Sequence, residues 1–164
     1  MSIGFYRVDD NYINFLKEID SRIRDPKDNK RAYVGIILSV SGTDFLAPLT
    51  SYKSKQDKIR PSTLTVFKLH EKNKPDNKLG MIQLGYMFPI LPSIATKIDY
   101  SNQAIKYNRL LATQYEFIRS EQDKIKARAE RLYEHVLTCS NPNDFYLKFS
   151  CDFLALLKQF RAFF

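Results

Sequence analysis

The segment FLAPLTSYKSK, residues 45–55, carries the side chains best suited to chemistry. Thr50 and Ser51 place two hydroxyls side by side where an apolar, strand-like stretch ends, and Lys53 and Lys55 follow at once. The end of a strand is a rigid mount, and hydroxyl and ammonium groups there can hydrogen-bond and neutralise a phosphate. We interpret Thr50, Ser51 and Lys53, the hydroxyl–lysine cluster, as a candidate site for metal-free phosphodiester chemistry or for RNA binding.

RNA cleavage without a metal uses the 2′-hydroxyl of the substrate as the nucleophile. The protein must then help to move protons and stabilise the charge that develops on the phosphorus, which lysines and hydroxyl donors can do. Histidine is the usual side chain for proton transfer near neutral pH, so His70 is a candidate acid or base, although a structural or surface role is the alternative. Lys68 and His70 alternate with Phe67 and Leu69, so both are expected to point away from the apolar face.

Other kinds of catalytic site find little support in the sequence. Ser51 lies outside a GxSxG motif, and no Gly-rich phosphate loop is present. The acidic residues are scattered and no CxxC or Cys/His cluster occurs, so we expect neither a metal site nor a cofactor. Cys139 and Cys151 are interpreted as two reduced thiols rather than a disulfide.

Length and composition predict one globular domain over residues 1–164. The 164 residues are 44% hydrophobic and 13% aromatic, which suffices for a single core and excludes general disorder. The apolar runs are much shorter than the roughly 20 residues that span a bilayer, and the N-terminus lacks the apolar core of a signal peptide. We therefore expect a cytoplasmic protein without membrane contact.

The net charge of +8 comes from two segments. Residues 30–74 carry nine basic and three acidic groups, and residues 106–131 carry seven basic and four acidic groups. Such a distribution favours a polyanionic partner, whereas the alternative is a merely solubilising surface. In the second segment Arg109 and the later basic residues can form a phosphate-binding stripe, but intervening acids also fit an ordinary solvated face.

Hydrophobic alternation predicts the strands that carry these side chains. They are expected over residues 4–8, 32–40, 43–49, 64–70, 79–84, 87–91 and 95–100. The strand 32–40 is apolar on both faces and should be central, with Ser41–Gly42 forming a hairpin turn. Pro48 cannot donate to a ladder, so pairing is expected to loosen just before Thr50. Loops are expected over residues 24–31 and 51–63, and a turn over residues 73–78.

Helical periodicity occurs near the N-terminus and again in the last third of the chain. Asp9 or Asp10 is expected to cap an early helix whose apolar stripe reaches Ile23. From Asn102 a period of 3.6 residues predicts one long helix or two shorter ones, and Pro142 opens a final helix lined by phenylalanines. The predicted fold class is α+β, a compact antiparallel sheet with helices packed around it.

The order of the motifs resembles the ToxN/AbiQ family of type III toxin–antitoxin endoribonucleases. The motifs are KRAYVGIIL, FLAPLTSYKSK, VFKLHE, LGMIQLGYMFPI and YNRLLATQYEFIR. The resemblance runs from Phe5 to Arg119, and APLTS-x-K is its most specific part. It implies a twisted antiparallel sheet partly surrounded by helices, similar to MazF-type toxins.

The resemblance implies a metal-independent toxin of phage abortive infection that cuts adenine-rich RNA. The expected products carry a 2′,3′-cyclic phosphate and a 5′-hydroxyl. The expected partner is a small pseudoknot RNA antitoxin, which the toxin cuts from a repeated transcript and which joins toxin units into a protein–RNA assembly.

The family's site motif falls directly on Thr50, Ser51 and Lys53. The basic position before the first long strand is lysine in the family pattern and corresponds to Arg31 here, with Lys30 beside it. Because arginine cannot act as a proton-transfer base near pH 7, a role of Arg31 is limited to phosphate binding. The remaining candidate RNA-binding residues are Tyr52, Lys55, Lys58, Arg60, Lys68, His70, Tyr107 and Arg109.

Two other functions remain open at the level of the sequence. A non-catalytic RNA-binding protein can use the same basic surface, with Tyr52, Tyr107 and Tyr115 stacking on unpaired bases. For Tyr107 and Tyr115, burial in the core is an equal alternative. A regulator that binds an acidic protein through the basic face is the third hypothesis.

Overall fold

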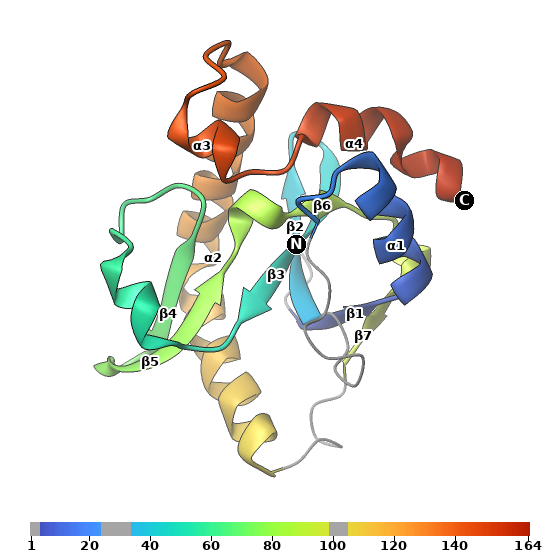
Figure 1. The fold of residues 1–164 in the computed structure, drawn as a ribbon. Coiled ribbons are helices and arrows are strands. Elements are labelled where there is room, and N and C mark those ends of the chain that lie inside the picture. Colours follow the sequence, from blue (N-terminus) through green and yellow to red (C-terminus); the bar gives the residue numbers. More distant parts are fainter. Residues whose placement is uncertain (1–3, 24–33, 99–104) are drawn as a thin grey trace.

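The structure is a computed structural model that describes residues 4–23, 34–98 and 105–164, with the backbone alone described for residues 105–107. A seven-stranded antiparallel sheet has the order β4-β5-β3-β2-β1-β7, with β6 paired to β3. Its strands are β1 (Tyr6–Val8), β2 (Val34–Val40), β3 (Thr43–Thr50), β4 (Phe67–Glu71), β5 (Lys74–Ile82), β6 (Phe88–Pro89) and β7 (Ala95–Lys97). The helix α2 crosses behind β4 and β5, whereas α1 and α4 lie beside β1 and β6 (Figure 1). This arrangement confirms the predicted α+β class; the similarity to MazF-type toxins stays a prediction.

The β2–β3 hairpin forms as predicted. Ser41 and Gly42 have φ angles of 47° and 80°, so both turn residues occupy the left-handed region that two-residue hairpin turns require. The strand β2 lies between β3 and β1 inside the sheet, which confirms its central position. Residues 32 and 33, the start of the predicted strand, lie outside the described residues.

The pairing of β3 differs from the expectation near the hydroxyl–lysine cluster. Pairing with β2 extends as far as Pro48 opposite Gly35. Beyond it the strand does not loosen, because Leu49 and Thr50 pair with Ile82 and Met81 of β5. The prediction of a frayed strand end is therefore wrong: β3 exchanges one partner strand for another, and Thr50 is held in a ladder.

The β4–β5 hairpin corrects the predicted turn over residues 73–78. The strand β5 begins at Lys74, which pairs with Glu71, so only Lys72 and Asn73 form the turn. Pro75 can be accommodated because this part of β5 is exposed. Residues 64–66 precede β4 rather than belonging to it, and the loop before them contains a short 3₁₀ helix, η1 (Ser54–Lys58).

Two helices flank the sheet as the periodicity predicts, although the first ends at Ile19 and does not reach Ile23. Asp9 caps α1 (Asp10–Ile19) by accepting a hydrogen bond from the backbone N–H of Asn11. The helix α2 (Ile105–Thr138) is continuous, which decides between the two predicted alternatives. Its buried stripe is formed by Leu111, Gln114, Phe117, Ile118, Ile125, Ala129 and Leu132.

The predicted final helix is divided into shorter pieces. They are α3 (Phe145–Lys148), α4 (Phe153–Gln159) and the 3₁₀ helix η5 (Phe160–Phe163). The division follows from two separate caps, because Asp144 accepts backbone N–H groups of α3 and Asp152 accepts that of Ala155 in α4. As a result Phe153 and Phe160 are buried, whereas Phe145 and Phe149 are exposed.

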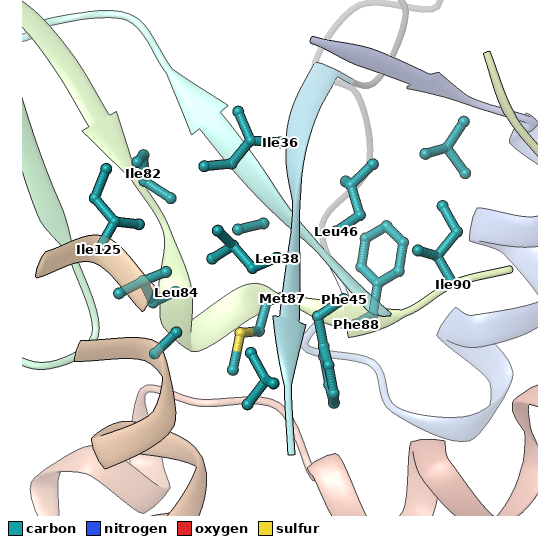
Figure 2. Close-up of a cluster of buried hydrophobic side chains, with 14 of the residues drawn as sticks. Ile36, Leu38, Phe45, Leu46, Ile82, Leu84, Met87, Phe88, Ile90 and Ile125 are labelled. Atoms are coloured by element: carbon teal, nitrogen blue, oxygen red, sulfur yellow. The ribbon is translucent and has the colours of Figure 1, made fainter. Parts of the chain in front are cut away.

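The core joins the sheet to the helices. Figure 2 shows Ile36 and Leu38 of β2 together with Phe45 and Leu46 of β3 in one buried cluster. Ile125 of α2 reaches the same cluster (Figure 2). Two further 3₁₀ helices, η2 (Leu84–Tyr86) and η3 (Pro92–Ile94), connect the later strands. None of the helices in the described part of the chain has the length and apolar character needed to cross a bilayer.

Arg128 of α2 holds the loop that leads from η1 to β4. Its Nη1 donates to the carbonyls of Pro61 and Val66, each at 2.9 Å, and its guanidinium lies 4.8 Å from the ring centre of Phe67. Its burial lowers its pKa but leaves it charged at neutral pH. Arg128 therefore serves the fold rather than the phosphate-binding stripe that the sequence suggested.

The variant Arg128→Met is expected to lower the free energy of unfolding by about 2 kcal/mol, because two charge-assisted hydrogen bonds to the loop are lost. Denaturant unfolding followed by circular dichroism measures this change. Arg131→Met, at an exposed position on the same helix, is the matched control and should shift stability by about 0.5 kcal/mol or less. Equal stability of the two variants would contradict the anchoring role.

Candidate functional site

The hydroxyl–lysine cluster lies where β3 leaves the sheet and η1 begins. Thr50 is the last residue of β3, and Ser51 and Lys53 are both exposed just beyond it. Lys53 has extended backbone angles, φ −139° and ψ 144°, and its carbonyl accepts the N–H of Gln56 at 2.9 Å. The strand end thus presents the side chains of Ser51 and Lys53 to solvent on an ordered backbone, as expected of a site that binds a large ligand.

The side chain of Gln56 hydrogen-bonds to this backbone and holds it in place. Its side chain is only 6% exposed, and its Nε2 donates to the carbonyl of Ser51 at 2.9 Å. The same nitrogen lies 3.5 Å from Oγ1 of Thr50. A buried amide that hydrogen-bonds to Thr50 and to Ser51 fixes the orientation of these two residues. A residue without substrate contact can preorganise a site in this way.

The variant Gln56→Leu should destabilise the fold by about 1–3 kcal/mol, since the Ser51 carbonyl loses its donor while the buried volume stays similar. It should also slow any reaction at the cluster by about tenfold, because a loosened backbone at Thr50 and Ser51 misplaces the reacting groups. Thermal unfolding and single-turnover cleavage measure the two effects. Gln159→Leu, at an exposed site on α4, should change neither, and a fully active Gln56→Leu would show that the bracing is unimportant.

A second set of polar side chains borders the cluster. Tyr52 donates its hydroxyl to Oδ2 of Asp57 at 2.6 Å, and Lys78 of β5 donates to Oδ1 of Asp57 at 2.8 Å. The ammonium of Lys78 lies 5.4 Å from the ring centre of Tyr52. The Lys78 hydrogen bond, followed by that from Tyr52, lowers the pKa of Asp57, and the bond to Asp57 raises the pKa of Tyr52 and of Lys78.

These pKa shifts determine the charges of the three side chains at neutral pH. Asp57 is a carboxylate, Lys78 an ammonium and Tyr52 a neutral phenol, so none of the three is ready to exchange a proton. Their arrangement instead holds the Tyr52 ring, which is 36% exposed, at a fixed angle beside Ser51 and Lys53. An ordered, accessible aromatic ring next to cationic groups suits stacking on an unpaired base.

Gly80 of β5 lies directly against the cluster backbone. Its φ is 116°, a value that L side chains rarely adopt, and a Cβ there would lie 1.9 Å from the carbonyl oxygen of Thr50. The pairing of β5 with β4 is also irregular here, since Leu69 pairs with Gly80 and His70 with Lys78. The resulting bulge bends β5 beside the strand end, as bulges near functional sites do.

His70 does not point as the alternation predicts. Its ring centre is 4.3 Å from that of Phe117 on α2, and its Nδ1 lies 2.8 Å from the carbonyl oxygen of Glu71. The irregular pairing on both sides of His70 interrupts the alternation of β4, so the ring turns toward the helix. The expected outward orientation is therefore wrong, although a role in RNA binding remains a prediction.

The other predicted RNA-binding residues are spread over three regions. Lys55, Lys58 and Arg60 are exposed in or just after η1, next to the cluster. Lys68 is half-buried on β4, where its charge contributes to the lowered pKa of Asp57. Arg109 is exposed on α2, about one turn before Gln114, whose Nε2 donates to the Leu79 carbonyl at 2.8 Å.

Three predicted residues have side chains that the structure does not describe. Lys30 and Arg31 are outside the described residues, as is the side chain of Tyr107. Tyr115 is partly buried against the core, which favours the structural alternative for this residue.

The structure adds Gln56, Asp57, Lys78 and Gly80 to the site. Only Gly80 left a signal in the sequence, because a glycine inside an apolar strand often marks a bulge or a close backbone approach. Lys78 carries no signal because NKPDNK has the composition of a turn, although the structure places it in the exposed half of a strand. The contacts of Asp57 with Tyr52 and Lys78 depend on η1, and no periodicity in the sequence predicts this 3₁₀ helix.

Comparisons with known proteins agree on one family. A family model described as toxin ToxN of a type III toxin–antitoxin system matches residues 4–161. An endoribonuclease ToxN of Pectobacterium atrosepticum is 35% identical over 97% of this chain and 92% of its own length. The endoribonuclease AbiQ of Lactococcus lactis subsp. lactis is 27% identical over 95% of this chain and 86% of its own length.

A solved structure supports the same assignment. It comes from work on a bacterial antiviral system that a processed non-coding RNA regulates. It superposes with a TM-score of 0.83 at 32% identity, covering 96% of this chain and 97% of the other. The similarity thus extends over nearly all of both chains.

Proposed function

The chain belongs to the ToxN toxin family of type III toxin–antitoxin systems, whose relatives are endoribonucleases, and we propose that it cuts RNA at the hydroxyl–lysine cluster. The observation that carries the proposal is the braced strand end, where Ser51 and Lys53 are exposed next to the half-buried Thr50 and the ordered ring of Tyr52. We propose that the functional domain is the whole chain, because one hydrophobic core cluster includes residues from Phe5 to Phe160.

The proposed reaction is a transesterification. The 2′-oxygen of the substrate attacks the adjacent phosphorus as its proton leaves, the bond to the 5′-oxygen breaks, and that oxygen takes up a proton. The products are a 2′,3′-cyclic phosphate and a 5′-hydroxyl. Every atom comes from the RNA, so the protein has only to position the phosphate, stabilise its charge and assist proton movement.

Each residue of the cluster has a distinct part in this reaction. The Lys53 ammonium stabilises the additional negative charge on the phosphorane, where electrostatic stabilisation has its largest effect. The hydroxyls of Ser51 and Thr50 donate hydrogen bonds to the non-bridging oxygens. Lys55, Lys58 and Arg60, with Lys30 and Arg31, hold neighbouring phosphates, and Tyr52 stacks on a base.

We further propose that an RNA antitoxin keeps the enzyme inactive. It is a small pseudoknotted RNA that the toxin cuts from a repeated transcript, and it occupies the same basic surface as the substrate. The similar antiviral system that a processed non-coding RNA regulates supports this partner and a role in phage defence. The protein and RNA units are proposed to assemble through the RNA, with adenine-rich RNA as the cellular substrate.

The deciding experiment is incubation with adenine-rich RNA in excess EDTA, followed by mapping of the ends. The expected result is cleavage that leaves cyclic phosphates, while an oligonucleotide with a single 2′-deoxyribose at the cut position resists. A strict requirement for magnesium would contradict the chemistry. Binding without cleavage would instead support the non-catalytic RNA-binding alternative, and purification free of nucleic acid would weaken the antitoxin proposal.

A further inference from the structure

Three side chains that commonly bind transition metals meet where α2 ends. His135 and Cys139 are one helical turn apart, and the N–H of Cys139 donates to the His135 carbonyl at 2.9 Å. Asp144 returns to them through a tight turn in which its N–H donates to the Asn141 carbonyl at 3.0 Å. The ligand atoms of the three residues all lie within 4.8 Å of one another.

The geometry is close to that of a zinc site. In tetrahedral zinc sites the metal is about 2.0–2.2 Å from nitrogen and oxygen ligands and about 2.3 Å from sulfur, so ligand atoms are roughly 3.3–3.7 Å apart. Nε2 of His135 and Oδ1 of Asp144 are now 2.8 Å apart in a hydrogen bond. A small opening of this pair and an approach of the Cys139 sulfur would bring the three ligand atoms to the separations of a tetrahedral site.

The surrounding contacts orient two of these ligands, Asp144 and His135. Oδ1 of Asp144 accepts the N–H groups of Tyr146 and Leu147 at 3.0 and 3.2 Å, which orients the carboxylate. The His135 ring packs edge-on against Tyr146, with 5.4 Å between ring centres and an interplanar angle of 89°. All three ligand side chains are half-buried, so an ion can enter from solvent yet is partly shielded from it.

We propose that His135, Cys139 and Asp144 bind one zinc-type transition-metal ion, with water as the fourth ligand. An ion there joins the last turn of α2 to the start of α3 and so stabilises the C-terminal segment. No sequence motif indicates this site, because Asp144 reaches His135 and Cys139 only through the turn that precedes α3. The hydroxyl–lysine cluster is separate: in Figure 1 the α2–α3 connection lies at the top, whereas the end of β3 lies well below it, near the middle of the view. The proposal therefore does not depend on the mechanism of cleavage.

The test is a titration of the tag-free protein with Co²⁺ in a non-thiol reductant. Cobalt replaces zinc in such sites and gives a thiolate charge-transfer absorption that only a sulfur ligand produces. We expect saturation at one equivalent, displacement by Zn²⁺, and a higher melting temperature with Zn²⁺. Cys139→Ser should remove the thiolate band and the thermal shift.

Two conservative variants keep the local hydrogen bonds while removing a ligand. Asp144→Asn retains the helix cap, since asparagine caps as well as aspartate does, and His135→Gln can still reach Asp144. Each should weaken cobalt binding at least tenfold, with an unchanged circular dichroism spectrum. His70→Gln, which removes the histidine of β4, is the matched control and should bind cobalt like the unmodified protein.

Absence of a thiolate band at millimolar cobalt would overturn the proposal, leaving the His135–Asp144 hydrogen bond as a structural contact only. A band that persists in Cys139→Ser, or that His70→Gln abolishes, would place the metal elsewhere and equally overturn it. None of these readouts uses RNA cleavage, so failure here is distinguishable from failure of the proposed enzymatic function.

Discussion

Lys53→Ala is expected to reduce single-turnover cleavage of RNA at least a hundredfold. The ammonium of Lys53 is exposed at the end of β3 beside Ser51, where the proposed phosphorane forms. Removing one preorganised donor to a developing charge typically costs about 10²–10³ in rate. Because the side chain is exposed and its backbone contact with Gln56 remains, the free energy of unfolding should change by only about 0.5 kcal/mol or less.

Companion variants separate the possible roles of this lysine. Lys53→Arg keeps the charge but cannot release a proton near neutral pH, so substantial retained activity would assign Lys53 to electrostatic stabilisation and not to proton transfer. Lys55→Ala should mainly weaken RNA binding and reduce its dependence on salt. Ser51→Ala should lose activity as Lys53→Ala does, whereas Lys158→Ala on α4 should behave like the unmodified protein. Full activity of both Lys53→Ala and Ser51→Ala would refute the site assignment.

The sequence predicted the parts of the fold that depend on local pattern. The β2–β3 hairpin follows from apolar alternation around Ser41 and Gly42, and α2 follows from one sustained period of 3.6 residues. The division of the last helix was not predicted, because the spacing of its phenylalanines continues across the caps at Asp144 and Asp152. The capping hydrogen bonds interrupt the helix at these two positions, although the apolar spacing alone favours a continuous one.

Contacts between distant segments escaped sequence reasoning in the candidate site too. Adjacent hydroxyls followed by lysines can be recognised by their types alone, so the sequence suffices to propose Thr50, Ser51 and Lys53 as candidates. Gln56 and Lys78 act through contacts with Ser51 and Asp57 that exist only once η1 and β5 are placed. Neither residue belongs to a pattern, since a buried amide and an exposed lysine are ordinary residues until their partners are known.

Gly80→Ala is expected to disable the site from the neighbouring strand. The added Cβ would lie 1.9 Å from the Thr50 carbonyl oxygen, at a φ of 116° that already strains an alanine. Strain at such a φ alone costs on the order of 1–3 kcal/mol, and the collision must also push β5 away from β3. We expect a loss of about 3 kcal/mol or more in unfolding free energy. Cleavage should fall about a hundredfold, because a displacement near 1 Å misplaces Thr50 and Ser51.

Gly42→Ala separates strain from displacement. Gly42 also has a positive φ, 80°, yet a Cβ there meets no atom within 4 Å, and the residue lies in the β2–β3 turn at the far end of β3. It should therefore lose stability from strain alone and cleave normally when assayed below its melting temperature. If Gly80→Ala, assayed equally far below its own melting temperature, also cleaves normally, then the position of the Thr50–Ser51 backbone does not limit the reaction. In that case catalysis must be assigned to groups that do not depend on the contact between β3 and β5.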